Sequence, residues 1–393
     1  MNGRFAVRGW RAVSLGVGAV LLVGLAIAWL GGGGHGHHPG VRRPVAAPGS
    51  PALPPPATPL LGVSVNHLFL DGTYSPAQID AQLSALEQTG ATDARCDALW
   101  DATEPQPPTG GTHRYDWSFD DRIAGALARH RLRWLPIIDY SVSWAQSIPG
   151  QDHSAPKFPL AYAAYAAAFV ARYGSGGSFW RQHPALPALP VGTIEIWNEP
   201  DGHTFWLPAA DPVGYGRLYA DARAAVKATA SNVRVIVGGL TNLPVFLPEL
   251  LSARPDLRGH IDGVAIHLYL PSPQAIVTQV SEDRVFLRSL GMATVPLYLT
   301  EFGWTPRPRG TLGWAPARLR PHYISTTISG LAQRNCALAG IFLYSWVTPE
   351  RNPANGFDWF GIHHPDGGHT ASEYAFAAGI RAAKAARASP KPC

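Results

Sequence analysis

The chain has 393 residues, of which 46% are hydrophobic and 15% are charged. A chain of this length and apolar content can fold as one large barrel or as two ordinary domains with a substantial core. The formal net charge is +5, but the arginines are scattered and form no compact basic stripe with interleaved aromatic residues. This distribution excludes nucleic acid as the expected partner.

The three cysteines are Cys96, Cys336 and Cys393. An odd and sparse set without metal-ligand spacing predicts neither a disulfide framework nor a zinc site. Cys96 falls in a predicted strand and Cys336 near the end of a predicted helix. We therefore expect each of these two to be a buried free thiol.

Three arginines, Arg4, Arg8 and Arg11, precede an almost unbroken apolar run at residues 12–30. The run has about the length that a helix needs to cross a bilayer, and basic residues before it predict that the N-terminus stays inside while the rest is exported. We expect residues 1–30 to form a cytoplasmic N-terminus and transmembrane anchor, with the remainder outside the cell membrane. A cleaved signal peptide, which gives a secreted protein, is the alternative, although its apolar region is usually shorter, roughly 7–15 residues.

Residues 31–59 consist mainly of Gly, Pro and Ala. This composition cannot bury a core and predicts a disordered, semi-rigid linker outside the membrane. Its histidines, His35, His37 and His38, are expected to bind a metal ion only adventitiously.

Residues 60–393 alternate between strand-like and helix-like segments, and the helical segments are long enough to connect parallel strands. Eight β-α pairs, with no Gly-rich phosphate turn after the first strand, predict a single (β/α)8 TIM barrel of the α/β class rather than a doubly wound sheet. The predicted strands cover residues 61–69, 92–97, 132–139, 193–198, 233–238, 263–269, 296–300 and 340–346. The predicted helices cover residues 76–90, 119–130, 160–173, 212–229, 245–253, 273–290, 317–336 and 370–386.

Two of these strands end in a glutamate. In TIEIWNEPDG, residues 193–202, an apolar run leads to Asn198 and Glu199 and is stopped by Pro200, which cannot continue a strand. In VPLYLTEFGW, residues 295–304, a run of β-forming residues ends in Glu301. The C-terminal ends of the strands of such a barrel face the active site, so we expect both carboxyl groups there.

Other polar and aromatic residues fall at the same expected strand ends. They are Asn66 and His67, Arg95 and Asp97, Asp139 and Tyr140, His267 and Tyr269, and Trp346. The set lacks a His-x-His at the first strand end and the later ligands that a metal-dependent barrel hydrolase needs. We therefore expect no metal and no other cofactor.

The strand-end motifs Asn-Glu-Pro and Thr-Glu-Phe-Gly, with Arg95 and Trp346, resemble those of the clan A glycoside hydrolases, in particular the family 39 and family 5 (cellulase-like) barrels. The segments ATDARCDALWDATEP and IFLYSWVTP share the resemblance, which extends over about residues 60 to 385. Each glutamate motif alone is a weak signal. Both together, at the fourth and seventh of eight strand ends, are a strong one.

The resemblance implies that Glu199 is the acid/base and Glu301 the nucleophile. It also implies that Asn198 binds the sugar 2-hydroxyl and that Arg95 and Tyr269 hold Glu301. The chemistry supplies an independent reason, because glycosidic cleavage needs one protonated and one ionised carboxyl group. A cation beside Glu301 keeps that group charged, and its charge raises the proton affinity of the partner.

Several single residues have structural alternatives. Arg95 could instead neutralise Asp97 or Asp139, and Tyr269 could be a core residue. His267, His203 and Trp304 are candidates for the walls of sugar-binding subsites, although packing is an equally common reason for such residues. His363 and His364, beside a Pro-Asp-Gly turn, are expected at the surface.

The sequence therefore predicts a monomeric, retaining β-glycoside hydrolase that cleaves the O-glycosidic bonds of an oligo- or polysaccharide by double displacement. One alternative is a catalytically silent carbohydrate-binding protein of the cell surface that kept the barrel. Another is a transglycosylase, which shares every catalytic residue. The motifs are common to enzymes of xylosyl, glucosyl, mannosyl, galactosyl and uronyl units, so they predict the reaction class and leave the sugar open.

Overall fold

The structure is a computed structural model that describes residues 50–386 and 391–393. The predicted anchor and most of the predicted linker, residues 1–49, lie outside the described residues. Among the residues that are described, no helix combines the length and apolar character that a bilayer span requires.

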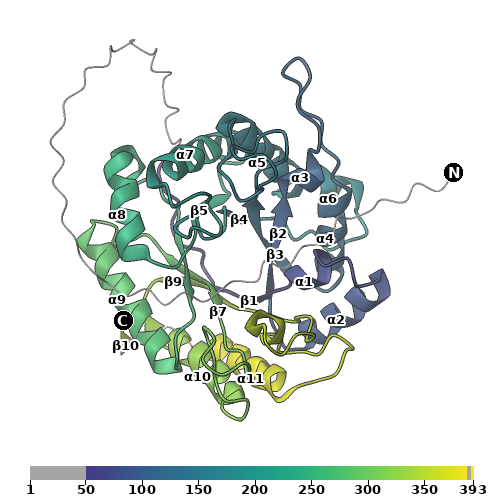
Figure 1. The fold of residues 1–393 in the computed structure, drawn as a ribbon, viewed down its shortest axis with the longest axis vertical. Coiled ribbons are helices and arrows are strands. Elements are labelled where there is room, and N and C mark those ends of the chain that lie inside the picture. Colours follow the sequence, from purple (N-terminus) through teal and green to yellow (C-terminus); the bar gives the residue numbers. More distant parts are fainter. Residues whose placement is uncertain (1–49, 387–390) are drawn as a thin grey trace. The chain divides into compact units, whose positions relative to one another are not determined.

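Eight parallel strands of the described chain close into a barrel, in which each strand pairs with the next and β9 pairs with β1. Figure 1 looks onto this ring of strands, with helices around it. The strands are β1 (Leu60–Ser64), β2 (Asp93–Leu99), β3 (Arg133–Asp139), β4 (Thr193–Ile196), β5 (Arg234–Leu240), β6 (Val264–Leu268), β7 (Leu297–Phe302) and β9 (Leu338–Leu343). The predicted (β/α)8 barrel is confirmed.

Eight longer helices connect or follow these strands. They are α2 (Pro76–Gln88), α4 (Ser118–Arg129), α5 (Pro159–Tyr173), α7 (Pro212–Thr229), α8 (Leu243–Ala253), α9 (Pro273–Ser289), α10 (Arg320–Ala332) and α11 (Ala371–Ala385). Short helical turns are α1 (Asn66–Phe69), α3 (Trp100–Thr103), α6 (Ser178–Gln182), η1 (Pro255–Leu257) and η2 (Gly356–Trp359).

The helix starts follow from local sequence. Proline occupies the first turn of α2, α7 and α9, where its missing N–H costs no hydrogen bond. The residue before each proline caps the helix: the side chains of Ser75, Asp211 and Ser272 accept from backbone N–H groups of the first turn. Several predicted boundaries were wrong by two or more residues. The first strand stops at Ser64 because α1 begins at Asn66, the helix expected at 317–336 is only α10, and the strand expected at 340–346 is β9.

Large side chains fill the barrel interior below the polar end. Tyr298 of β7 packs with Ile236, Ala265 and Ala339 in a fully buried layer. Gly263 makes room for it, since a Cβ at that position would lie 2.4 Å from the Tyr298 ring. The interior is thus a packed core that supports the site above it.

The last residues of the predicted linker pack on the barrel. Ala52 N donates to Gly259 O at 2.8 Å, and Leu53 N donates to the Asp262 carboxylate at 2.8 Å. Arg234 Nε donates to Pro54 O at 3.0 Å. The expectation of a free linker as far as residue 59 was therefore wrong for this segment, because its backbone finds partners at the base of the barrel.

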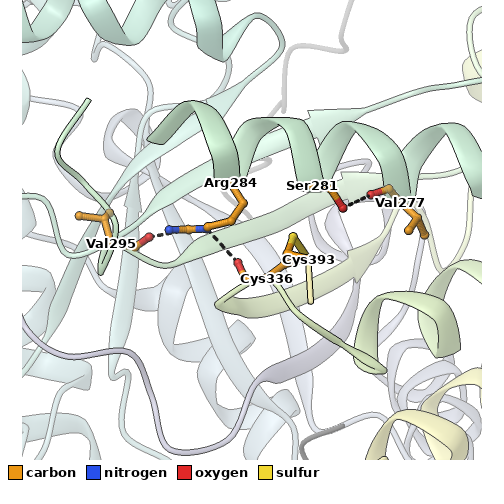
Figure 2. Close-up of a disulfide and its surroundings, with 6 residues drawn as sticks. All are labelled: Val277, Ser281, Arg284, Val295, Cys336 and Cys393. Atoms are coloured by element: carbon orange, nitrogen blue, oxygen red, sulfur yellow. Dashed lines mark hydrogen bonds between the residues drawn. A yellow bond between two sulfur atoms is a disulfide. The ribbon is translucent and has the colours of Figure 1, made fainter. Parts of the chain in front are cut away.

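A disulfide joins Cys336 to Cys393, which are 57 residues apart. The strands β8 (Arg334–Asn335) and β10 (Lys391–Pro392) pair in parallel and bring the two cysteines together. Figure 2 shows Arg284 of α9 beside the bridge, donating to Cys336 O at 3.0 Å and to Val295 O at 2.6 Å. The prediction of a free thiol at Cys336 was wrong, whereas Cys96 is free and buried as predicted.

Candidate active site

Arg95 lies at the centre of a buried polar cluster inside the C-terminal end of the barrel. The side chain comes from β2 and is fully buried. Its Nε donates to Glu195 at 2.9 Å, one Nη to Glu301 at 2.6 Å and the other Nη to Asn198 at 3.0 Å. One guanidinium therefore ties residues of β4 to β7 across the barrel.

Glu301, near the end of β7, is held in its ionised form. The Tyr269 hydroxyl donates to Glu301 Oε2, and His267 Nδ1 lies 3.7 Å from the same oxygen. Burial raises the pKa of Glu301, but His267, Arg95 and the bond from Tyr269 together outweigh it, so the pKa falls below its ordinary value. An ionised and oriented carboxylate is suited to act as a nucleophile.

Glu199 follows β4, and its pKa is shifted in the opposite direction from that of Glu301. Trp197 and Glu199 have positive φ angles of 66° and 44°, a conformation that costs non-glycine residues about 1–3 kcal/mol and collects at functional sites. His267 Nδ1 lies 2.7 Å from Glu199 Oε1. Burial raises the pKa of Glu199 and the charge of Glu301 adds to the rise, while His267 opposes it without reversing it. A carboxyl group that keeps its proton can act as a general acid.

The two carboxyl groups lie close together. One oxygen of Glu199, one oxygen of Glu301 and a ring nitrogen of His267 are all within 4.8 Å of one another. Three such groups could in principle bind a divalent cation. Arg95 already contacts Glu301 at 2.6 Å, so its positive charge disfavours a cation there.

His267 fits between the two glutamates because the neighbouring strand has a glycine. A Cβ on Gly239 of β5 would lie 2.0 Å from His267 Nε2. The backbone N–H of Gly239 also donates to Glu195 Oε1 at 2.7 Å. Burial lowers the pKa of His267, but Glu301 and Glu199 raise it by more, so the net direction is upward.

Glu195 is a site residue that strand-end reasoning does not find. It lies inside β4 with no exposed surface and accepts two bonds from Arg95, at 2.9 and 3.2 Å. The signal was a glutamate between Ile194 and Ile196. Since side chains alternate along a strand, a charged residue between two outward apolar ones points into the barrel.

Asp97 and Asp139 also occupy strand ends, but neither hydrogen-bonds to Arg95. Asn66 holds Asp97 by two bonds, at 2.8 and 3.1 Å, and burial raises the pKa of Asp97 to about 6. Asp139 is fully buried, and burial raises its pKa well above the ordinary value. Arg95 therefore pairs with Glu195 and Glu301 rather than with these aspartates.

Two of the residues that were expected at the site do not line it. Trp304 and Trp346 have no exposed surface; their indole N–H groups donate to Leu270 O and Gln82 Oε1, each at 2.8 Å. His203 is exposed on the loop after β4, and its place in a subsite stays a prediction. Both tryptophans are better described as packing residues.

Tyr344 takes the place expected for Trp346. It directly follows β9, is partly exposed, and its ring packs edge-on against Tyr269 with centroids 6.2 Å apart. Burial and then the charge of Glu301 raise its pKa. The sequence signal was an aromatic residue within the predicted strand 340–346, two positions before Trp346 and therefore on the same face of that strand.

The histidines at other predicted positions have local partners. His67, on α1, pairs with Asp71 at 2.9 Å. His364 is exposed as expected and pairs with Glu350 at 2.9 Å. His363 is 1% exposed, so the prediction that it lies at the surface was wrong. Its ring stacks on Trp346 at 4.7 Å.

A hollow of about 390 Å³ adjoins the cluster. His267 and Tyr269 form its inner wall, and Thr241, Asn242 and Leu312 are among its other lining residues. Two larger hollows, of about 620 and 730 Å³, are lined by none of the residues of the polar cluster. The hollow is of the size that small organic ligands occupy, and it adjoins the site through His267 and Tyr269, whereas neither Glu199 nor Glu301 is among its lining residues.

The fold is that of the clan A type (β/α)8 glycoside hydrolases. Solved structures of such enzymes superpose on more than four fifths of this chain. No protein-family model matches the sequence, and no curated protein matches it.

Three of these structures illustrate the likeness. A β-xylosidase of Caulobacter crescentus CB15 has 20% identity and a TM-score of 0.64, with 83% of this chain and 69% of that chain covered. A family 39 glycoside hydrolase of Bacteroides cellulosilyticus WH2 has 20% identity and a TM-score of 0.61, with 82% and 64% covered. A GH5_18 protein of Streptomyces cattleya, solved with GlcNAc, has 15% identity and a TM-score of 0.63, with 87% and 83% covered. At these identities the likeness establishes the fold.

Proposed function

We propose that this protein is a retaining β-glycoside hydrolase in which Glu301 is the nucleophile and Glu199 the acid/base. The observation that carries the proposal is the pair of carboxyl groups at the ends of β4 and β7. One carboxyl oxygen of Glu199 and one of Glu301 lie within 4.8 Å of each other. The pKa of Glu199 is raised, whereas the pKa of Glu301 is lowered. Retaining enzymes place these groups about 5–5.5 Å apart, whereas inverting enzymes leave roughly 6.5–9.5 Å for a water molecule.

In the first step Glu301 attacks the anomeric carbon. The bond to the leaving oxygen breaks as Glu199 gives that oxygen its proton. Arg95 and Tyr269 keep Glu301 ionised and oriented. Asn198, which accepts a hydrogen bond from Arg95 at 3.0 Å, would form a hydrogen bond with the sugar 2-hydroxyl.

In the second step Glu199, now a carboxylate, removes a proton from water. The water oxygen attacks the anomeric carbon and the bond to Glu301 breaks. Two inversions give net retention. The steps require the two carboxyl groups, water and a β-linked oligo- or polysaccharide, and a single barrel carries every residue they use, so we propose a monomer.

We further propose that the barrel works outside the cytoplasm, held at the cell membrane by residues 12–30. The Cys336–Cys393 disulfide supports this proposal, because structural disulfides persist in oxidising compartments. Protease added to intact cells should release an active fragment. A soluble protein that begins near Gly31 would indicate a cleaved signal peptide instead.

The decisive test follows the anomeric proton of the first-formed product by NMR, on a substrate found with a panel of aryl glycosides and polysaccharides. We expect retained configuration from the wild type and an inverted glycosyl azide from Glu301→Gly in the presence of azide. First-formed product of inverted configuration would refute the mechanism. No hydrolysis of any member, with binding retained, would identify a silent carbohydrate-binding protein, and transfer to added acceptor sugars would identify a transglycosylase.

A further inference from the structure

A second cluster of potential metal ligands lies outside the candidate active site. It joins the loop after β9 to the first turn of α11. His363 Nδ1 lies 2.8 Å from Glu373 Oε2, and His369 Nδ1 lies 3.0 Å from both Glu373 oxygens. One ligand atom from each of the three residues falls within 4.8 Å of the others.

Two of the three side chains are fixed by their surroundings. The His363 ring stacks on Trp346 with an interplanar angle of 11°, and its backbone N–H donates to Trp346 O at 2.9 Å. Glu373 is 4% exposed, and its backbone N–H is capped by Thr370 Oγ1 at 3.1 Å. Ligands whose orientation is set in advance favour metal binding.

The Glu373 carboxylate has no arginine or lysine partner in the described structure. Asp262, for comparison, pairs with Arg223 at 3.1 Å and Lys227 at 2.9 Å. In the described part of the chain, Glu373 has ion-pair contacts only with His363 and His369. Burying a carboxylate without a permanent cation beside it is costly. A divalent cation among the three groups would offset that cost.

We propose that His363, His369 and Glu373 bind a zinc ion, with a fourth position open to water. Two histidines and one carboxylate form a ligand set that Zn²⁺ takes in tetrahedral sites, with bonds of about 2.0–2.2 Å. Ligand atoms then lie about 3.3 Å apart, a few tenths of an ångström more than the hydrogen bonds here. His369, whose side chain is 53% exposed, can make this adjustment. No arginine forms an ion pair with these three residues in the described structure, whereas Arg95 pairs with Glu301 of the Glu199–His267–Glu301 trio.

The site would brace a loop that touches the candidate active site. Phe360, three residues before His363, packs on Tyr269 and on Tyr344 with centroids 5.5 Å apart in each case. Tyr269 in turn donates to Glu301. An ion that ties His363 to α11 therefore steadies the wall of the site without taking part in its chemistry.

The test titrates the purified, chelator-treated full-length chain with zinc chloride by calorimetry. The linker histidines His35, His37 and His38 are replaced in every sample, so that they add no adventitious binding. His369→Ala removes a half-exposed ligand, and His364→Ala is the matched control, since His364 is 47% exposed and pairs with Glu350. Circular dichroism checks the fold of each variant, and cobalt replaces zinc for absorption spectra.

We expect one equivalent of zinc, tetrahedral cobalt bands, and a melting temperature that rises with zinc because the ion binds the folded state. His369→Ala should weaken binding about 100-fold or more, since even changes around a ligand cost 10–100-fold, while His364→Ala keeps it. The proposal is overturned if no stoichiometric zinc binds, or if His369→Ala binds as the parent does. Zinc binding that is lost in Glu301→Gln but kept in His369→Ala would place the ion in the Glu199–His267–Glu301 trio, and this result would also overturn the proposal.

Discussion

Arg95 has two effects that can be separated by a second substitution. Arg95→Met leaves Glu195, which has no exposed surface, as an unpaired buried charge. Removing one partner of a buried pair costs about 3–5 kcal/mol, so we expect the free energy of unfolding to fall by that amount. Turnover should fall about 100-fold or more, because Glu301 also loses its 2.6 Å bond and its orientation.

Adding Glu195→Gln to Arg95→Met removes the stranded charge and should restore part of the stability, while turnover stays low. Urea unfolding and aryl-glycoside hydrolysis measure the two quantities. Arg133→Met is the control: its pair with Asp93 is at the start of β3 and Arg133 is 39% exposed, so activity should be unchanged. If the double variant recovers activity together with stability, Arg95 serves only to neutralise Glu195.

Three further predictions test the electrostatics and the disulfide. The profile of kcat/KM against pH should be bell-shaped, rising as Glu301 ionises below its ordinary pKa and falling as Glu199 deprotonates above its own; by carboxyl NMR, Glu301→Gln should lower the pKa of Glu199 partway. Burial raises the pKa of Asp120 to about 7, so the folded state keeps a proton that the unfolded state releases near pH 4. As the pH rises between these values, the free energy of unfolding falls by about 1.4 kcal/mol per pH unit. Asp120→Asn should therefore be more stable than the wild type at pH 8 but not at pH 4, and the same difference between the two urea curves at both pH values would contradict this. Cys393→Ser opens a 57-residue loop and should cost about 4 kcal/mol, whereas Cys96→Ser leaves the response to reductant intact; a denaturation midpoint insensitive to reductant would refute the assignment.

Much of the fold could be predicted because each element carries a local signal. Proline with a capping residue marks the starts of α2, α7 and α9, and apolar runs mark the strands. The disulfide depends instead on a contact across 57 residues. Nothing near Cys336 in the sequence indicates that the chain end returns to it, so the pairing could not be found from spacing.

The site was predictable where a residue ends a strand and was missed where orientation decides. Glu199 and Glu301 follow from their positions at the strand ends, whereas Arg95 lies inside β2 (Asp93–Leu99). Glu195 depends on which side of β4 faces inward. Trp346 was expected at the end of the eighth strand, but the chain leaves that strand after Leu343, and alternation no longer sets which way the side chain of Trp346 points.

Tyr344 therefore provides a last test, of the aromatic wall. Its partly exposed ring stands beside Tyr269, whose hydroxyl bonds Glu301, so a sugar held at Glu301 would contact it. Tyr344→Ala should lower kcat/KM about 10- to 100-fold, mainly through KM, with each tenfold corresponding to about 1.4 kcal/mol. Tyr344→Phe should retain most activity if the ring rather than the hydroxyl makes the contact. Trp346→Phe, which leaves Gln82 without its 2.8 Å bond, should lower stability and leave KM unchanged. A raised KM for Trp346→Phe at full stability, with Tyr344→Ala unaffected, would return the subsite to Trp346.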